Sequence, residues 1–154
     1  MKDPDKYFYD IMMRVKEQST CKTRKVGCII ALDGRIVSEG WNSPPFGSDT
    51  SLCKRDKCNG GSVVVSGNNM ETVLCVHAEV NAIGTCARFG IQLGGMHKSV
   101  IYTPETPCSE CAKLIITAGI KEVVFESEYN TIYSLIIFKN AGVKIRNFFS
   151  EDYL

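Results

Sequence analysis

Two short motifs constrain this chain more than any other feature. The first is His77-Ala78-Glu79, and the second, about thirty residues later, is Pro107-Cys108-Ser109-Glu110-Cys111. His77, Cys108 and Cys111 are ligands that zinc prefers, and three ligands leave one position of a tetrahedral ion open for water. Glu79 is close enough to His77 to face that water without binding the metal. The motifs therefore predict a catalytic zinc centre with Glu79 as its acid–base residue.

A structural zinc site is the alternative interpretation. In that case His77 would cap a helix and the two cysteines would belong to a closed zinc knuckle. A closed site needs neither a proline before its first cysteine nor a glutamate beside its histidine. A non-catalytic zinc-binding module would also leave Glu79 dispensable. The open pattern favours catalysis over both.

Length and charge set the class of protein. The 154 residues are 44% hydrophobic and 23% charged, which predicts one globular domain over residues 1–154. The net charge of +1 argues against a polymeric nucleic acid as substrate, because a long polyanion requires a clustered basic face. A small anionic substrate needs only a few local cations. The polar N-terminus and the absence of an 18-residue apolar run predict no secretory signal, no membrane span and a cytoplasmic chain.

Eight cysteines are more than the two motif ligands require. In a cytoplasmic chain they are expected to bind metal or lie in the core rather than form disulfides. Residues 48–75 form an insert without clear periodicity, and a second, structural zinc could hold it. The cysteines that would bind this zinc are Cys21, Cys53, Cys58 and Cys75. Cys28 and Cys86 lie in apolar stretches and are predicted to be buried.

Hydrophobic periodicity and turn residues divide the chain into alternating elements. Helices are predicted at 3–18, 77–89, 109–118 and 131–141, and strands at 26–32, 35–40, 99–103, 121–126 and 143–148. This order predicts an α/β fold, a three-layer α/β/α sandwich around a five-stranded mixed sheet whose last three strands are parallel. Both motifs then begin helices, so their side chains can converge on one metal. The last helix is expected to bury Ile132, Leu135, Ile136 and Phe138.

Two loops have open interpretations. Residues 19–25 form a polar basic loop, which is either a solvated turn or a phosphate contact. Residues 41–47 form a rigid loop after a strand, which either carries function or covers the edge of the core with Trp41. By their position beside the metal ligands, the backbone of Ala78 and the carbonyl groups from Thr103 to Pro107 are predicted to contact a substrate ring.

The two motifs together read H-x-E … P-C-x-x-C, the pattern of zinc-dependent nucleobase deaminases. The chain resembles the deoxycytidylate deaminase family of the cytidine deaminase-like superfamily, from about residue 6 to residue 148. The segments that carry the resemblance are His77 to Ile83, Pro107 to Ile116, Ala118 to Lys121, Val26-Gly27-Cys28 and Gly40-Trp41-Asn42, with Cys53, Cys58 and Cys75 similar to extra cysteines of some members.

The resemblance implies hydrolytic deamination of deoxycytidylate (dCMP) to deoxyuridylate and ammonia, a step that feeds thymidylate synthesis. It also implies that Asn42 contacts the deoxyribose or base and that Tyr129 lies by the substrate phosphate. The alternative is a deaminase of the same fold that acts on another cytosine or purine substrate, as nucleoside, free base, RNA or single-stranded DNA. A substrate panel would separate these possibilities.

Oligomeric state and regulation are also implied by the resemblance. The family suggests a hexamer that is controlled by dCTP and dTTP with Mg²⁺ through a G-Y-N-G loop. The corresponding residues here are Gly40, Trp41, Asn42 and Ser43, which differ from the family at two of four positions. Ser43 replaces a glycine that would allow close backbone approach. The resemblance therefore supports the prediction of catalysis more strongly than the prediction of regulation.

Overall fold

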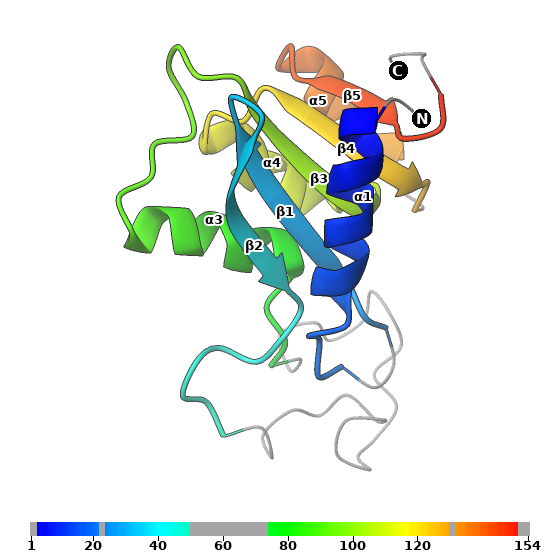
Figure 1. Ribbon diagram of the computed structural model, residues 1–154. Helices are drawn as coiled ribbons and strands as arrows, with labels where there is room; N and C mark the ends of the chain where they lie inside the picture. The colour runs from blue at the N-terminus through cyan, green and yellow to red at the C-terminus, as the bar shows by residue number, and fades with distance from the viewer. Residues whose placement is uncertain (1–2, 22–23, 50–73, 130–131, 151–154) are drawn as a thin grey trace.

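The computed structural model describes residues 3–21, 24–49, 74–129 and 132–150, and it confirms the predicted three-layer α/β/α sandwich (Figure 1). The elements are α1 (Asp3–Lys16), β1 (Gly27–Leu32), β2 (Arg35–Trp41), α3 (Ala78–Arg88), β3 (Ser99–Glu105), α4 (Ser109–Thr117), β4 (Glu122–Ser127), α5 (Ile132–Asn140) and β5 (Lys144–Asn147). Their order is the predicted one. Within the described ranges, no helix is both long and apolar enough to cross a membrane.

The sheet has the strand order β2-β1-β3-β4-β5. Strand β1 is antiparallel to both β2 and β3, whereas β3, β4 and β5 are parallel, as predicted. The β1–β2 hairpin turns at Asp33 and Gly34, which both have positive φ (49° and 80°). Positive φ at both central residues is the requirement of the tight hairpin turn that matches strand twist. The Asp-Gly signal therefore identified this hairpin correctly.

The parallel strands bring distant segments to one edge of the sheet. Glu105, at the end of β3, pairs with Ser127, at the end of β4. The backbone N–H of Thr106 donates to the Ser127 carbonyl at 3.0 Å, which extends the contact beyond the strands. The carboxyl ends of parallel strands are where ligand sites form in open α/β sheets. The segment after β3 leads directly into Cys108, and the segment after β4 carries Tyr129.

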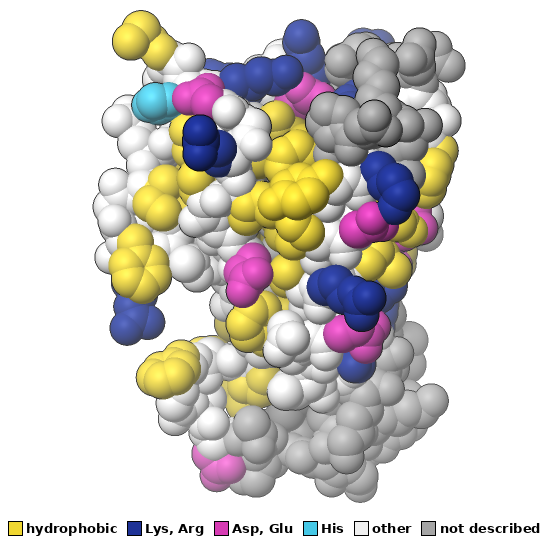
Figure 2. All heavy atoms as spheres, in the orientation of Figure 1, with side chains coloured by type: hydrophobic (Ala, Val, Ile, Leu, Met, Phe, Trp, Pro, Cys, Tyr) yellow, Lys and Arg dark blue, Asp and Glu magenta, His cyan; other side chains and the backbone are white. Residues whose placement is uncertain are grey.

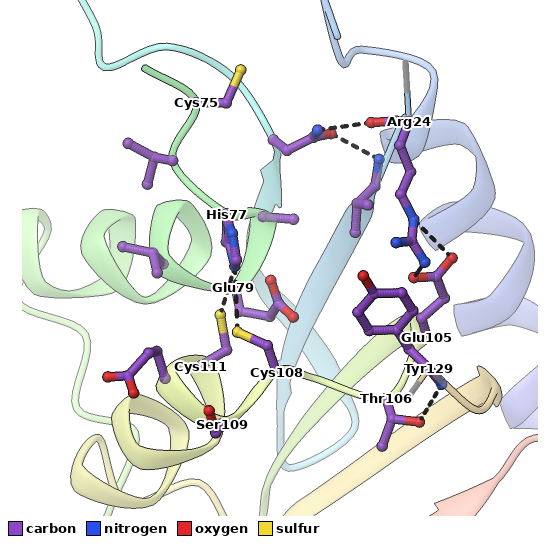
Figure 3. Close-up of a pocket in the computed structure, with 16 residues that line it drawn as sticks. Arg24, Cys75, His77, Glu79, Glu105, Thr106, Cys108, Ser109, Cys111 and Tyr129 are labelled. Carbon is purple, nitrogen blue, oxygen red and sulfur yellow. Dashed lines mark hydrogen bonds and ion pairs between the residues drawn. The ribbon is translucent and has the colours of Figure 1, made fainter. Parts of the chain in front are cut away.

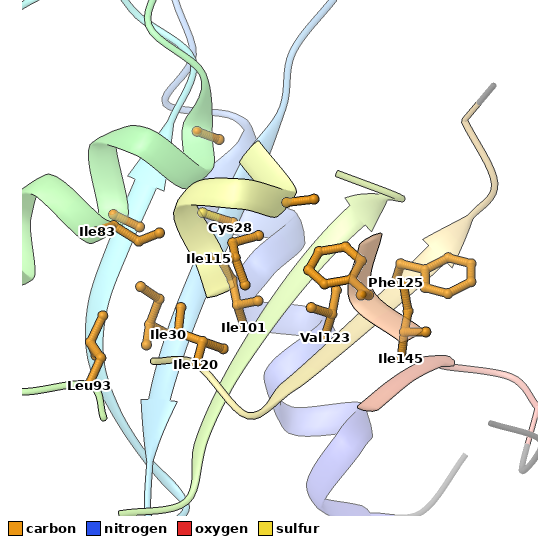
Figure 4. Packing of buried hydrophobic residues seen from close by; sticks show 14 of the residues in the cluster. Cys28, Ile30, Ile83, Leu93, Ile101, Ile115, Ile120, Val123, Phe125 and Ile145 are labelled. Atoms are coloured by element: carbon orange, nitrogen blue, oxygen red, sulfur yellow. The ribbon is translucent and has the colours of Figure 1, made fainter. Parts of the chain in front are cut away.

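Alternating side chains of the sheet build two cores. On one face, Ile29 and Ala31 of β1 pack with Phe8 and Met12 of α1. On the other face, a larger cluster lies beneath α3, α4 and α5 (Figure 4). Its fully or almost fully buried members include Cys28, Ile30, Cys86, Ile101, Ile115, Val123 and Phe125. Burying one such aliphatic side chain contributes roughly 1.5–3 kcal/mol. The predicted burial of Cys28 and Cys86 is confirmed.

Gly40 sets the distance between β2 and α3. A Cβ atom on Gly40 would lie 2.3 Å from the Ala78 carbonyl oxygen and 2.5 Å from the Ala82 nitrogen. No other residue fits so close to a helix backbone. Next to it, the Ser38 hydroxyl donates to the Ala82 carbonyl at 2.8 Å. Gly40, predicted as part of an effector loop, is thus a buried packing residue that places the start of α3.

The last helix differs from its prediction. Ile132 and Ile136 are 76% and 56% exposed, while Ser134 and Phe138 are fully buried. Ser134 and Phe138 are four residues apart and therefore share one face of α5. The prediction that Ile132 and Ile136 lie on the buried face was wrong. Because six of the nine residues of this helix are apolar, its sequence did not specify which face packs against the sheet.

Candidate active site

The two motifs meet because His77 and Cys108 occupy equivalent positions. His77 is the N-cap residue of α3 and Cys108 is the N-cap residue of α4, and both have extended backbone angles. Cys111 lies one turn into α4. Nδ1 of His77 lies 3.3 Å from Sγ of Cys111 and 3.6 Å from Sγ of Cys108 (Figure 3). All three ligand atoms lie within 4.8 Å of one another.

These three side chains fit a zinc ion. Zinc binds sulfur at about 2.3 Å and nitrogen at about 2.0 Å, so a tetrahedral ion separates a nitrogen and a sulfur ligand by roughly 3.5 Å. The two observed distances from His77 are close to this value. One imidazole and two thiols are also the soft and borderline donors that zinc selects. In the part of the chain that the structure describes, this is the one cluster of its kind.

The cluster favours the charged form of one thiol. A hydrogen bond from Cys111, aided by one from His77, lowers the pKa of Cys108 to about 4 in spite of burial. The same hydrogen bond, together with burial, raises the pKa of Cys111. The thiolate is the form that binds metal. The pair therefore holds one proton readily, and a cation between the sulfurs would favour its release.

Glu79 lies in the first turn of α3 and is only 6% exposed. Figure 3 shows its carboxylate beside the two cysteines, on the side that faces Tyr129. Burial raises the pKa of Glu79 above its usual value, although nearby hydrogen bonds oppose the change. A carboxyl group with a raised pKa can both accept and return a proton near neutral pH.

The cluster opens into a cavity of about 740 Å³. Besides the ligands and Glu79, its lining consists of Arg24, Val26, Asn42, Cys75, Val76, Ala78, Val80, Glu105, Thr106, Ser109, Glu110 and Tyr129. This volume is in the range of small-molecule sites. The cavity therefore has a metal-ligand end, formed by His77, Glu79, Cys108 and Cys111, and an opposite wall that comes from other segments.

Arg24, Glu105 and Tyr129 form that opposite wall (Figure 3). Nε of Arg24 donates to Oε1 of Glu105 at 3.2 Å, and a second guanidinium nitrogen contacts Oε2. The guanidinium carbon lies 4.1 Å from the centre of the Tyr129 ring. The Glu105 side chain was not predicted, although its carbonyl lies in the predicted range from Thr103 to Pro107. Arg24 was predicted only as part of a basic loop that is either a solvated turn or a phosphate contact. The signal that could have identified Glu105 is its position at the carboxyl end of a parallel strand.

The predicted substrate contacts divide into two groups. Ala78, Asn42 and Tyr129 line the cavity. Thr103 and Pro107 are buried and are not part of its lining. The strand β3 continues to Glu105, two residues past its predicted end, and the Thr103 hydroxyl donates to the Glu105 carbonyl at 2.7 Å. Glu105 and Thr106, between these two residues, are the ones that reach the cavity.

Asn42 fastens the loop that carries Arg24. Its Oδ1 accepts hydrogen bonds from the Ser19 hydroxyl at 2.6 Å and the Val26 N–H at 2.8 Å. Its Nδ2 donates to the Arg24 carbonyl at 2.8 Å. Both ends of the side chain are therefore occupied by hydrogen bonds to Ser19, Arg24 and Val26. A direct contact with substrate stays a prediction.

The remaining predicted residues lie around the entrance to α3. Asn81 donates to the Trp41 carbonyl at 2.8 Å, and Ser43 exchanges backbone hydrogen bonds with Val76, next to His77. The predicted effector loop is thus tied to the segment that carries a metal ligand. Of the four cysteines of the second predicted zinc, Cys21 is buried and Cys75 lines the cavity. Cys53 and Cys58 lie outside the described residues, so that prediction is untested.

Comparison with known proteins agrees with this geometry. The model of the cytidine and deoxycytidylate deaminase zinc-binding region matches residues 2–127. The deoxycytidylate deaminase of Schizosaccharomyces pombe is 31% identical over 152 residues, covering 96% of this chain but 45% of the relative. The chain thus spans about half the length of that protein. The deoxycytidylate deaminase of Mycobacterium phage D29 is 33% identical over 129 residues, covering 82% of this chain and 96% of the relative.

A solved structure is similar over nearly the whole chain. The dCMP deaminase of cyanophage S-TIM5, in complex with dCMP and dUMP, superposes with a TM-score of 0.76. It is 29% identical in sequence, and the match covers 96% of this chain and 98% of that one. The ligand cluster, the fold and these relatives agree: the chain belongs to the deoxycytidylate deaminase family within the cytidine deaminase-like superfamily.

Proposed function

We propose that this protein hydrolyses dCMP to dUMP and ammonia and so feeds thymidylate synthesis. The observation that carries the proposal is the placement of a buried Glu79 beside a His–Cys–Cys cluster in one cavity. The phage D29 relative, which this chain covers almost completely, is a deoxycytidylate deaminase. The S-TIM5 enzyme binds dCMP and dUMP, which supports a nucleoside monophosphate as substrate.

The metal would be held by Nδ1 of His77 and by the sulfurs of Cys108 and Cys111. Zinc bound there supplies Lewis acidity, which lowers the pKa of a water molecule from about 15.7 toward about 7, less so with two thiolate ligands. The N-cap positions of His77 and Cys108 keep both side chains in front of their helices. The partial positive charge of the helix N-termini stabilises the thiolates.

Glu79 is proposed to move the protons. It accepts a proton from the water whose oxygen bonds to C4 of the cytosine ring. It delivers this proton to the ring nitrogen N3. It then takes the second proton from the new C4 hydroxyl and gives it to the exocyclic amine, so that the C4–N bond breaks, a C4 carbonyl forms and ammonia leaves. One carboxyl group can perform both steps because its raised pKa lets it hold the proton between them. The Ala78 backbone and Asn42 are proposed ring or sugar contacts, and Tyr129 a neighbour of the phosphate.

A substrate panel tests the proposal. Ammonia release is measured with deoxycytidine, dCMP, dCTP and a cytosine-containing oligonucleotide, with zinc quantified per chain. We expect dCMP to have the highest kcat/KM. Preference for the oligonucleotide would instead identify a nucleic-acid deaminase. Lys and Arg are interspersed with Asp and Glu on the face shown in Figure 2, as a small-substrate enzyme would have them. Absence of ammonia from every pyrimidine would support a non-catalytic zinc module.

Family membership is also the basis for proposals about a second zinc, the oligomeric state, regulation and location. A second zinc bound by Cys21, Cys53, Cys58 and Cys75 would give two zinc ions per chain rather than one. A hexamer would be found by measuring the mass of the purified protein in solution. Control by dCTP and dTTP with Mg²⁺ would change the rate at subsaturating dCMP. A cytoplasmic location is expected and would be tested by fractionating cells of the source.

A further inference from the structure

Three distant segments meet at the wall of the cavity opposite the metal ligands. Arg24 comes from the loop before β1, Glu105 from the end of β3, and Tyr129 from the segment after β4. The guanidinium of Arg24 contacts both carboxylate oxygens of Glu105 and lies over the Tyr129 ring. Its backbone carbonyl accepts a hydrogen bond from Asn42. The guanidinium is therefore held by the Glu105 carboxylate and the Tyr129 ring, and the backbone of Arg24 is held by Asn42.

The neighbouring residue Lys25 does not share the contacts of Arg24. Lys25 follows Arg24 in the chain, but its ammonium pairs with Glu17 at 3.0 Å and does not line the cavity. Of the residues described as lining the cavity, Arg24 is the one with a permanent positive charge. Glu79, Glu105 and Glu110 bring carboxyl groups to the same lining. Among these described lining residues, Arg24 is therefore the one that offers an anionic substrate a permanent favourable charge.

We propose that Arg24 binds the 5′-phosphate of the substrate, and that Glu105 and Tyr129 are positioning residues that hold its guanidinium there. The proposal rests on the proposed function, because the base of a nucleotide must then lie at Glu79. A guanidinium has five N–H donors in a rigid fork, and Glu105 takes two of them. Other donors of the fork can then bond phosphate oxygens, as charge-assisted hydrogen bonds.

The segment after β3 connects the two ends of the cavity. Glu105 lies three residues before the ligand Cys108. Between them, the Thr106 hydroxyl accepts a hydrogen bond from the Tyr129 N–H at 3.1 Å. One short segment thus carries Glu105 and a metal ligand and binds the backbone of Tyr129. This segment therefore links the metal-ligand end to the opposite wall, as a substrate with a base at one end and a phosphate at the other requires.

The test compares kcat/KM for dCMP with kcat/KM for deoxycytidine, which lacks the phosphate. In Arg24→Gln the ratio of the two is expected to fall by about 10- to 100-fold, the effect of losing charge-assisted hydrogen bonds. Lys25→Ala removes a cation from the same loop and is the matched control. Its ratio of kcat/KM for dCMP to kcat/KM for deoxycytidine is expected to equal that of the wild type. Arg24→Lys keeps the charge but loses the fork, and about a 3- to 10-fold fall is expected.

The positioning role of Glu105 is tested with the same kcat/KM ratio in two variants. Glu105→Ala is expected to lower the ratio by about 10-fold, because the guanidinium loses its orientation. Glu105→Gln keeps a hydrogen-bond acceptor and should recover most of that loss. Thermal unfolding and zinc content show whether each variant is folded. If Arg24→Gln does not fold, the kcat/KM ratio of Arg24→Lys is used to test the inference instead. A ratio within twofold of the wild type in the folded Arg24 variants overturns this inference alone. Failure of the wild type to deaminate dCMP overturns the proposed function instead.

Discussion

The two ends of the cavity are built in different ways. At the metal-ligand end, His77, Cys108 and Cys111 come from two short motifs, each at the start of a helix. At the opposite end, Arg24 and Glu105 are 81 residues apart in the chain and meet only through the sheet. Each motif of the first arrangement is local in sequence, although the fold must bring the two motifs together. The second arrangement has no local motif and depends entirely on the topology.

Burial separates the two ends as well. Glu79 and Cys111 are 6% and 1% exposed. The side chains of Arg24 and Glu105 are 35% and 30% exposed. Glu79 is expected to act on the cytosine ring whether or not the substrate carries a phosphate. Arg24 is expected to act only on substrates that carry a phosphate. Changes at the two ends should therefore have different substrate dependence.

The largest effect is expected at the metal-ligand end. Glu79→Gln keeps the shape of the side chain and its zinc but removes the group that accepts and returns the proton. Turnover of dCMP and of deoxycytidine should fall together, by about a thousandfold or more. Ammonia release from both substrates, with zinc quantified, measures this. Near-normal activity in zinc-loaded Glu79→Gln would contradict the role of Glu79.

A change in packing should also act on both substrates. In Gly40→Ala the new Cβ would meet the backbone of Ala78 and Ala82, so α3 must move. The free energy of unfolding is expected to fall by about 3 kcal/mol, with weaker zinc binding. The matched control is Gly84→Ala, on α3 itself, where a Cβ meets nothing within 4 Å. Its helix propensity should raise stability by up to about 1 kcal/mol. Denaturant unfolding that ranks the two variants equally would contradict this packing role.

The smallest effect is expected from the loop that holds Arg24. Asn42→Ala removes the acceptor for Ser19 and Val26 and the donor to the Arg24 carbonyl. We expect a loss of about 2 kcal/mol in stability. The kcat/KM ratio of dCMP to deoxycytidine should fall, but less than in Arg24→Gln. An equal fall in kcat/KM for both substrates would contradict this loop role and would support the proposed contact of Asn42 with the ring or sugar.

The sequence predicted the parts of this molecule that depend on short-range pattern. The order of elements, the Asp33-Gly34 hairpin and the ligand motifs all depend on residues within one or two turns of each other. The pairing of Arg24 with Glu105 depends on strand order, which periodicity does not encode. The buried face of α5 was also mispredicted, because Ile132 and Ile136 are as apolar as the buried Phe138 and only packing distinguishes them.

Equilibrium binding to an enzyme that cannot turn over tests the division between the two ends most directly. Calorimetry would measure dCMP and deoxycytidine binding to zinc-loaded Glu79→Gln and to the same protein with Arg24→Gln added. We expect Glu79→Gln to bind dCMP about 10- to 100-fold more tightly than deoxycytidine. The second substitution should remove this preference. Failure of zinc-loaded Glu79→Gln to bind dCMP, or a preference that persists without Arg24, would contradict the proposed roles of the two ends.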